Sequence, residues 1–260
     1  VKIQNTNPRS TNITKVEIIS NLTIDESKGG INGIIELDSE YITINGNKNN
    51  ILVSNLLNWK GFLKNGEGDG DTIVETGYSN IIVKDINILS NNSSLKNDNS
   101  TINGSGWLLQ SHYGNSLTSG YLRITNCTSN GNIGYLQGGL CGSYFGIYSN
   151  NVDVDILNNS TSGEISNITN FGGGGIMGSR AFQESNLNLN INNCSSTGII
   201  SKNGGGLFGQ ESFNKIDNGV IVIEECTTSG DMVGEKSGGL FGTMMLNNIK
   251  NVNITIKKCN

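Results

Sequence analysis

The stretch Ile223-Glu-Glu-Cys-Thr-Thr-Ser-Gly230, followed eight residues later by Gly238-Gly-Leu-Phe-Gly242, recurs through the second half of the chain. Upstream copies of the first segment begin at Ile191, Ile156 and Ile124, and copies of the second are Gly205-Gly-Leu-Phe-Gly209, Gly174-Gly-Ile-Met-Gly178 and Gly138-Gly-Leu-Cys-Gly142. One column of the repeat reads Cys127, Asn159, Cys194, Cys226 and Cys259, with steps of 32, 35, 32 and 33 residues. A period of this length predicts a solenoid or a propeller.

The segment before each column position alternates aliphatic and polar residues, as in Val152-Asp-Val-Asp-Ile156 and Leu187-Asn-Leu-Asn-Ile191. A period of two is typical of a strand with one buried face. One such strand per repeat predicts an all-β fold, a right-handed parallel β-helix (β-solenoid) with coils of about 33 residues. A propeller is the alternative, but its blades need four strands in about 40 to 45 residues. The predicted inward columns are Leu122, Val154, Leu189, Ile221, Ile254 and Ile124, Ile156, Ile191, Ile223, Ile256.

The domain organisation follows from where the repeat is visible. We expect residues 1–40 to form an N-terminal coil or cap and residues 41–260 to form the β-helix. Because Cys259-Asn260 falls inside a fifth copy of the repeat, we expect the β-helix to continue beyond the covered sequence. The longest loops are predicted at 64–77, 91–106 and 111–119, where a solenoid can carry function.

Composition excludes several classes of partner. The formal net charge is −5 and only 15% of residues are charged, without a basic cluster that would bind nucleic acid. No apolar segment approaches the ~20 residues of a membrane span.

The strand, Ser/Thr-x-Gly and Gly-Gly-Leu-x-Gly segments resemble the GLUG motifs of bacterial surface adhesins and of repeat proteins from large DNA viruses. The phrases Ile42-Thr-Ile-Asn-Gly46 and Ser79-Asn-Ile-Ile-Val-Lys-Asp-Ile86 resemble coils of the pectate-lyase-like β-helix superfamily. That superfamily contains lyases, hydrolases, adhesins, viral fibres and spacers, so the resemblance implies a fold and leaves the activity open.

Asp153 and Asp155 are the acids nominated for catalysis. They should both point outward, roughly 6.5 to 7 Å apart along the strand, which falls within the spacing of an inverting glycosidase pair. The structural alternative is that Asp155 pairs with Arg123 on the neighbouring coil.

The loop Gly66-Glu-Gly-Asp-Gly-Asp-Thr-Ile73 is the weak candidate for a metal site, with Glu67, Asp69 and Asp71 as oxygen ligands for calcium. A solvated turn is the alternative interpretation.

The cysteine column is interpreted as structural. Cys141 stands where later coils have Met177, Phe208 and Phe241, so it is expected to pack as a small apolar residue. We favour reduced thiols, although neighbouring coils place Cys194–Cys226 and Cys226–Cys259 within disulfide reach.

Aromatic residues predicted to be exposed offer a glycan-binding shelf, made of Tyr113, Tyr121, Tyr144 and Phe145. Ordinary loop packing is the alternative. The single histidine, His112, is predicted to lie on the surface.

Together these features predict a structural or adhesive β-solenoid of a virion or cell-surface assembly, such as a fibre, a capsid-associated element or an adhesin. Its loops would bind other structural proteins of the assembly or surface glycans. A homo-oligomer is compatible with this function. No cofactor is expected. The alternative is a polysaccharide-processing hydrolase or lyase. A third alternative, an ice- or crystal-binding face, needs outward threonine ladders, whereas the outward positions read Arg123, Asp155, Asn190, Val222 and Thr255.

Overall fold

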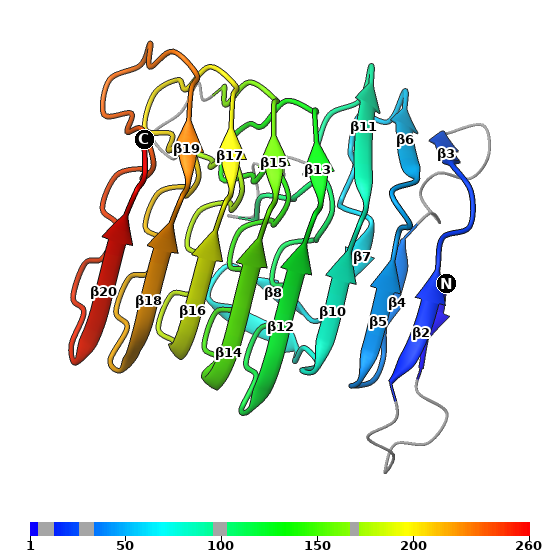
Figure 1. Ribbon diagram of the computed structural model, residues 1–260, viewed down its shortest axis with the longest axis horizontal. Coiled ribbons are helices and arrows are strands. Elements are labelled where there is room, and N and C mark those ends of the chain that lie inside the picture. Colours follow the sequence, from blue (N-terminus) through cyan, green and yellow to red (C-terminus); the bar gives the residue numbers. More distant parts are fainter. Residues whose placement is uncertain (5–12, 26–33, 96–102, 167–171) are drawn as a thin grey trace.

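The computed structural model describes residues 1–4, 13–25, 34–95, 103–166 and 172–260, which form a stack of coils built from parallel strands (Figure 1). All regular secondary structure in these residues is β, as predicted, and the coils repeat about every 33 residues over about seven turns. The described part of the chain has no helix long and apolar enough to span a membrane.

The first face of the solenoid is an eight-stranded parallel sheet (Figure 1). Its strands, in order, are β2 (Thr14–Glu17), β5 (Ile42–Asn45), β10 (Ile81–Lys84), β12 (Gly120–Thr125), β14 (Asn150–Leu157), β16 (Asn186–Asn192), β18 (Gly219–Glu224) and β20 (Val252–Lys257). Leu122 pairs with Val154, Val154 with Leu189, Leu189 with Ile221 and Ile221 with Ile254. The predicted inward columns are therefore confirmed, and they are buried except on β20, where Ile256 is 44% exposed.

The second face is a seven-stranded parallel sheet of shorter strands. It contains β3 (Leu22–Asp25), β6 (Asn50–Ser54), β11 (Asn87–Asn91), β13 (Thr128–Ser129), β15 (Ser160–Thr161), β17 (Ser195–Ser196) and β19 (Thr227–Thr228). Two residues after β15, β17 and β19 stand Gly163, Gly198 and Gly230, where each coil closely approaches the backbone of the preceding coil. A Cβ on Gly163 would lie 1.8 Å from the carbonyl oxygen of Gly131, so only glycine fits there.

The third face begins with β1 (Lys2–Ile3), β4 (Ile35–Leu37) and β7 (Leu63–Lys64) and continues as single bridges from coil to coil. These bridges join Leu109 to Cys141, Cys141 to Met177, Met177 to Phe208 and Phe208 to Phe241. The predicted equivalence of Cys141 with a methionine and two phenylalanines is therefore confirmed. The described residues of the N-terminal segment 1–40 take part in all three faces through β1 to β4.

Five turn ribbons connect the third face to the next strand of the first face, at residues 111–116, 143–148, 179–184, 210–215 and 243–248. Every second residue of a ribbon has a positive φ, for example Tyr144 (57°), Gly146 (67°) and Tyr148 (58°). The ribbons stack through their backbones: Tyr144 donates its N–H to Ser179 of the next coil at 3.0 Å, and Gly146 donates to Tyr113 of the preceding coil at 3.0 Å. Residues 111–116, predicted to lie in an irregular loop, are thus a regular part of the stack.

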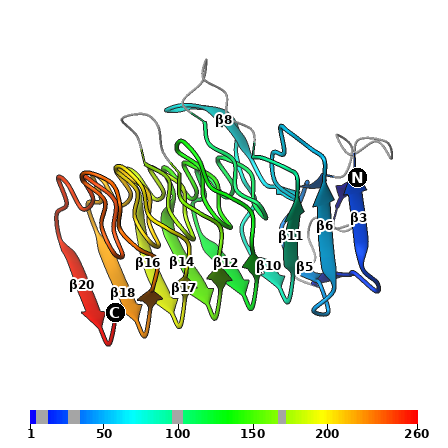
Figure 2. The same cartoon turned by 90° about the horizontal axis from the view of Figure 1, so that it is seen from above.

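One antiparallel hairpin departs from the coil pattern. It consists of β8 (Glu67–Asp69) and β9 (Thr72–Glu75), and it lies outside the stacked coils (Figure 2). Of the predicted loop 91–106, residues 96–102 lie outside the described part of the chain.

Candidate functional site

The outward face of β12, β14 and β16 carries the two acids nominated for catalysis. Asp153 lies between Tyr121 and Asn188, and Asp155 lies between Arg123 and Asn190. Arg123 Nε donates to Asp155 Oδ2 at 3.0 Å, which confirms the predicted pairing across one coil. Asn190 Nδ2 donates to the other Asp155 oxygen at 3.2 Å, and Asn188 Nδ2 donates to Asp153 at 3.0 Å. Both carboxylates are therefore engaged by donors from neighbouring coils.

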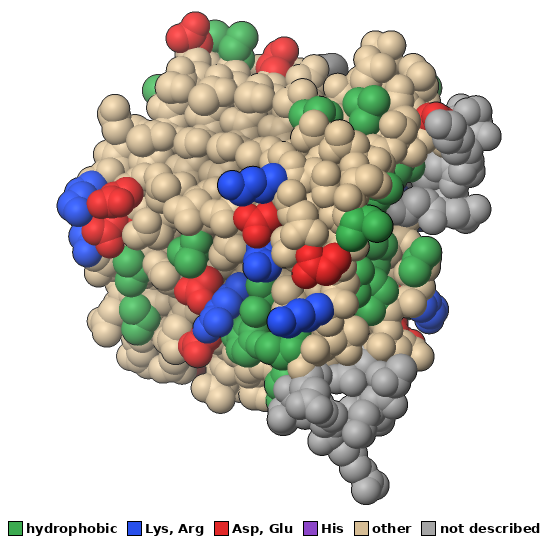
Figure 3. All heavy atoms as spheres, turned by 45° about the vertical axis from the view of Figure 1, so that its right-hand side comes forward, with side chains coloured by type: hydrophobic (Ala, Val, Ile, Leu, Met, Phe, Trp, Pro, Cys, Tyr) green, Lys and Arg blue, Asp and Glu red, His purple; other side chains and the backbone are tan. Residues whose placement is uncertain are grey.

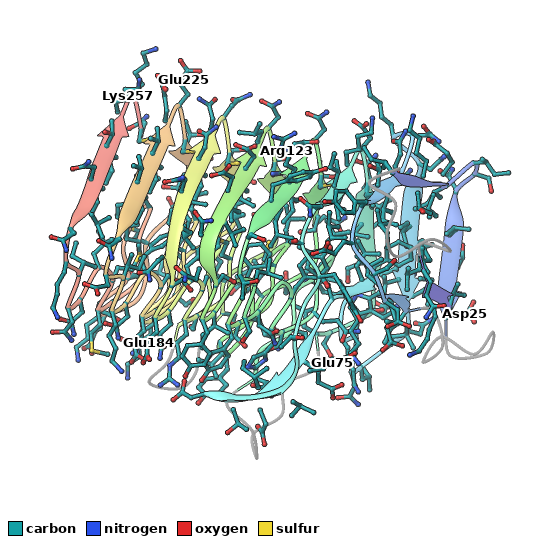
Figure 4. The ribbon with its side chains drawn as sticks, turned by 90° about the horizontal axis from the view of Figure 1, so that it is seen from below. Asp25, Glu75, Arg123, Glu184, Glu225 and Lys257 are labelled. Atoms are coloured by element: carbon teal, nitrogen blue, oxygen red, sulfur yellow. The ribbon has the colours of Figure 1, made fainter. Side chains whose placement is uncertain are left out.

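Tyr121 belongs to the same outward face. The guanidinium carbon of Arg123 lies 4.7 Å from the centroid of the Tyr121 ring, a cation–π contact on an exposed sheet. Arg123 lies on the same side of the solenoid as Glu225 and Lys257, while Glu75 and Glu184 lie on the opposite side (Figure 4). Arg123 thus contacts both the Tyr121 ring and Asp155 on the outward face of the sheet.

An asparagine ladder follows the end of these strands, and the sequence analysis missed it. Asn126 donates to Asp85 at 3.0 Å, Asn158 donates to Asn126 at 3.2 Å, and Asn193 donates to Asn158 at 2.9 Å. These asparagines have φ between 51° and 55°, a left-handed conformation that asparagine tolerates better than most residues. The signal was available, because each asparagine directly precedes a position of the cysteine column.

The cysteine column lies at the next position and is buried at Cys127, Cys194 and Cys226, and all four of its thiols are free. Burial raises the pKa of Cys127 to about 12. The Cys194 thiol donates to the carbonyl oxygen of Ile156 at 3.3 Å, and Asn159 Nδ2 makes the equivalent bond to Ile124 at 2.8 Å. From Asn159 onward, each member of the column therefore donates to a carbonyl oxygen of the preceding coil.

Lys64 lies at the base of the β8–β9 hairpin among three glutamates. Its Nζ is 3.2 Å from Glu36, 2.8 Å from Glu67 and 3.0 Å from Glu75. Burial lowers the pKa of Lys64, but the hydrogen bonds to the three carboxylates raise it by more, so the net pKa lies above the ordinary value. The Glu67 carboxylate, nominated as a metal ligand, is thus committed to a lysine, and the hydrogen bond from Lys64 lowers its pKa.

The tip of the hairpin rests on the turn ribbons. Asp71, a second nominated metal ligand, has its Oδ1 3.8 Å from Arg180 Nη1, and its carbonyl oxygen accepts a bond from the Tyr148 hydroxyl at 3.2 Å. Asp69, the third nominated ligand, lies exposed on β8. Within the described residues, no three His, Cys, Asp or Glu side chains are grouped to hold a metal ion.

His112 is fully buried beneath the hairpin, so the prediction that it lies on the surface is wrong. Its Nε2 is 2.8 Å from the carbonyl oxygen of Gly70, its Nδ1 is 2.8 Å from Ser111 Oγ, and its ring stacks on Tyr144 with centroids 4.7 Å apart. The hairpin thus covers an imidazole that the first turn ribbon presents. Burial lowers the pKa of His112, while the bond to Gly70 and the nearby acids oppose that shift.

The predicted exposure of Tyr113, Tyr144 and Phe145 is also wrong, because all three side chains are buried. Tyr113 stacks on Phe145 at 6.1 Å, and this column continues through Phe182 and Phe213 inside the ribbons. Tyr144 is enclosed between His112 and Arg180, whose Nη1 donates to its hydroxyl at 2.5 Å. The recurrence of an aromatic residue at the repeat spacing was the signal that these side chains belong to the core.

Charged side chains of both signs are interspersed on the face shown in Figure 3. Ion pairs join side chains of neighbouring coils, including Glu211 with Arg180 at 2.8 Å and Glu224 with Lys257 at 3.0 Å. Exposed pairs, such as Lys258 with Glu225, contribute little stability individually. Each such pair places opposite charges side by side on adjacent coils.

Comparisons of the chain with protein-family models, with curated proteins and with solved structures gave no match.

Proposed function

We propose that this chain is a structural or adhesive β-solenoid of a virion or cell-surface assembly, where it holds loops and an outer face toward a protein or glycan partner. The observation that carries the proposal is the repeated bonding of polar side chains from coil to coil. Neighbouring coils are bonded to each other by the Asp155–Arg123 pair, by the asparagine ladder and by the cysteine column. Side chains used in this way support the shape of a rod.

The GLUG-like Gly-Gly pentapeptides favour the same function. Their glycines lie where coils approach most closely, since a Cβ on Gly139 would lie 1.8 Å from the carbonyl oxygen of Gly175. The resemblance to adhesin and viral repeats therefore rests on residues that the coil geometry requires. The pectate-lyase-like alternative, a polysaccharide hydrolase or lyase, depends instead on Asp153 and Asp155.

The geometry of Asp153 and Asp155 suits bonding between coils better than catalysis. A general acid needs a raised pKa and a free approach to the glycosidic oxygen. Both carboxylate oxygens of Asp155 instead accept bonds from neighbouring coils, one from the Arg123 guanidinium and one from the Asn190 amide, so a substrate has no free approach to them. We therefore assign this pair to the bonding between neighbouring coils.

Cryo-electron microscopy of the native assembly, with this chain located in it, tests the proposal. We expect the solenoid to be packed among other chains or to project from a particle or cell surface. A reducing-end assay on a panel of polysaccharides, with wild type and an Asp153→Asn, Asp155→Asn variant, tests the enzyme alternative. Polymer cleavage by wild type that the double variant lacks would overturn the structural assignment.

A further inference from the structure

A surface groove of about 500 Å³ lies at the corner where the later turn ribbons lead into the eight-stranded sheet. This volume falls within the range of about 300 to 1,000 Å³ that is usual for small-molecule sites. The polar residues that line it are Glu184, Asn186, Lys215, Asp217, Asn248 and Lys250. The groove is on the opposite side of the solenoid from Arg123, as the position of Glu184 shows (Figure 4).

The backbone under the groove is fixed by the stacking of the coils. Lys215 donates its N–H to Asn247 at 2.8 Å, and Lys250 donates its N–H to Ile216 at 2.8 Å. Ile216 is buried beneath the groove. The polar side chains are therefore presented from a pre-formed frame, which reduces the ordering cost of binding.

The polar groups divide into a paired set and an unpaired set. Lys215 Nζ lies 2.6 Å from Glu184 Oε1, so this pair neutralises itself. By contrast, the side chains of Asp217, Asn248 and Lys250 make no hydrogen bond or ion pair with any other part of the chain that the structure describes. This differs from the outward face of β14, where both aspartates are held by neighbouring coils.

We infer that this groove binds a neutral sugar residue of a glycan. Its two ammonium groups and two carboxylates cancel, so it has no net charge that would select an acidic or basic ligand. The unpaired groups comprise an acceptor, Asp217, a donor, Lys250, and an amide that does both, Asn248. Sugar hydroxyls both donate and accept, so several of them can satisfy all three side chains together.

This inference deepens the proposed function, because it names a glycan as the partner and gives it a site. Saturation-transfer NMR on the full chain tests it with the methyl glycosides of glucose, galactose and N-acetylglucosamine. Methyl galacturonate and alanine serve as the acidic and zwitterionic probes. The groove variants are Asp217→Asn and Lys250→Met, and the charge-matched controls on the opposite side are Asp153→Asn and Lys257→Met.

We expect at least one neutral glycoside to bind wild type and both controls, and to bind each groove variant about tenfold more weakly, as for loss of a charged hydrogen bond. Folding of the variants is checked by circular dichroism, since these exposed side chains support no other part of the described structure. Absence of binding by all neutral glycosides, binding only of the acidic or zwitterionic probe, or equal weakening in the controls would each overturn the site. None of these results would contradict the rod-like scaffold, which microscopy and the polysaccharide assay test separately.

Discussion

Asn159 interrupts the cysteine column, and its replacement by valine probes how the coils are joined. The Asn159 side chain is 1% exposed and bonds the preceding coil twice. Its Oδ1 accepts the backbone N–H of Cys127 at 2.8 Å, and its Nδ2 donates to the carbonyl oxygen of Ile124 at 2.8 Å. Valine fills similar space but leaves both backbone groups without this partner.

A buried donor or acceptor that loses its partner costs about 1 to 3 kcal/mol. Since Asn159→Val affects one of each, we expect the free energy of unfolding to fall by about 3 kcal/mol. For a chain of this size that corresponds to a melting temperature lower by roughly 6 to 12 °C.

Asn159→Cys should cost much less stability than Asn159→Val, although cysteine is less polar than asparagine. The thiols at the same position in later coils donate to the equivalent carbonyl oxygens, as Cys194 does to Ile156 at 3.3 Å and Cys259 does to Ile223 at 3.6 Å. Sulfur also accepts weakly from a backbone N–H. We therefore expect Asn159→Cys to lose about 1 kcal/mol.

Thermal unfolding followed by circular dichroism, under reducing conditions, compares the two variants. Asn253→Val is the matched control, because Asn253 is exposed on β20 and its change should stay within about 0.5 kcal/mol. If valine and cysteine at position 159 destabilise the chain equally, side-chain bonding is not what the column supplies, and the explanation is refuted.

Three further predictions concern the hairpin and the asparagine ladder. Lys64→Met leaves three glutamates facing one another without a cation between them. Amide hydrogen exchange at neutral pH should show that the free energy of opening of the hairpin falls by about 2 kcal/mol, and part of this loss should be recovered as the carboxylates protonate at lower pH. Unchanged protection of the hairpin amides would contradict this role of Lys64. Because burial lowers the pKa of His112 from 6.5, its contribution to stability is present above about pH 6.5 and is lost as the pH falls below that value. Melting temperatures between about pH 7.5 and about pH 5 should fall more steeply for wild type than for His112→Asn, and equal slopes would sink the idea. Glu225→Asn, at a φ of 55°, should extend the ladder and raise the free energy of unfolding by about 0.5 kcal/mol, which a lower melting temperature would disprove.

The stacked part of the molecule could be predicted from the sequence because each repeat carries the same alternation of inward and outward residues at nearly the same spacing. Alternation around Val154 and Ile156 assigned the inward columns, and the constant spacing then assigned the outward pairing of Asp155 with Arg123. Register in a parallel stack follows directly from alignment of the repeats. Any residue with a counterpart one period away could therefore be placed.

The predictions that are wrong concern residues of the turn ribbons. Tyr113 and Phe145 are one period apart and stack on each other, although both are predicted to be exposed. The positive φ values of the turn ribbons explain this, since such a backbone can place an aromatic side chain in the core within a glycine-rich segment. His112 was misplaced for another reason, because its cover is a hairpin that occurs once and has no counterpart in other repeats.

The paired and the unpaired polar groups of this solenoid also differ in how readily they can bind a ligand. On the face of β12 to β16, a ligand would have to break bonds such as that between Asp155 and Arg123 before it could form its own. In the groove, Asp217 and Lys250 are already free to bind, so a ligand there does not compete with a hydrogen bond or ion pair inside the chain. Desolvation is then the main cost of binding on that side. For a rigid stack, we therefore expect glycan contact at the corner beside the turn ribbons and expect the flat sheet to serve mainly in holding the coils together.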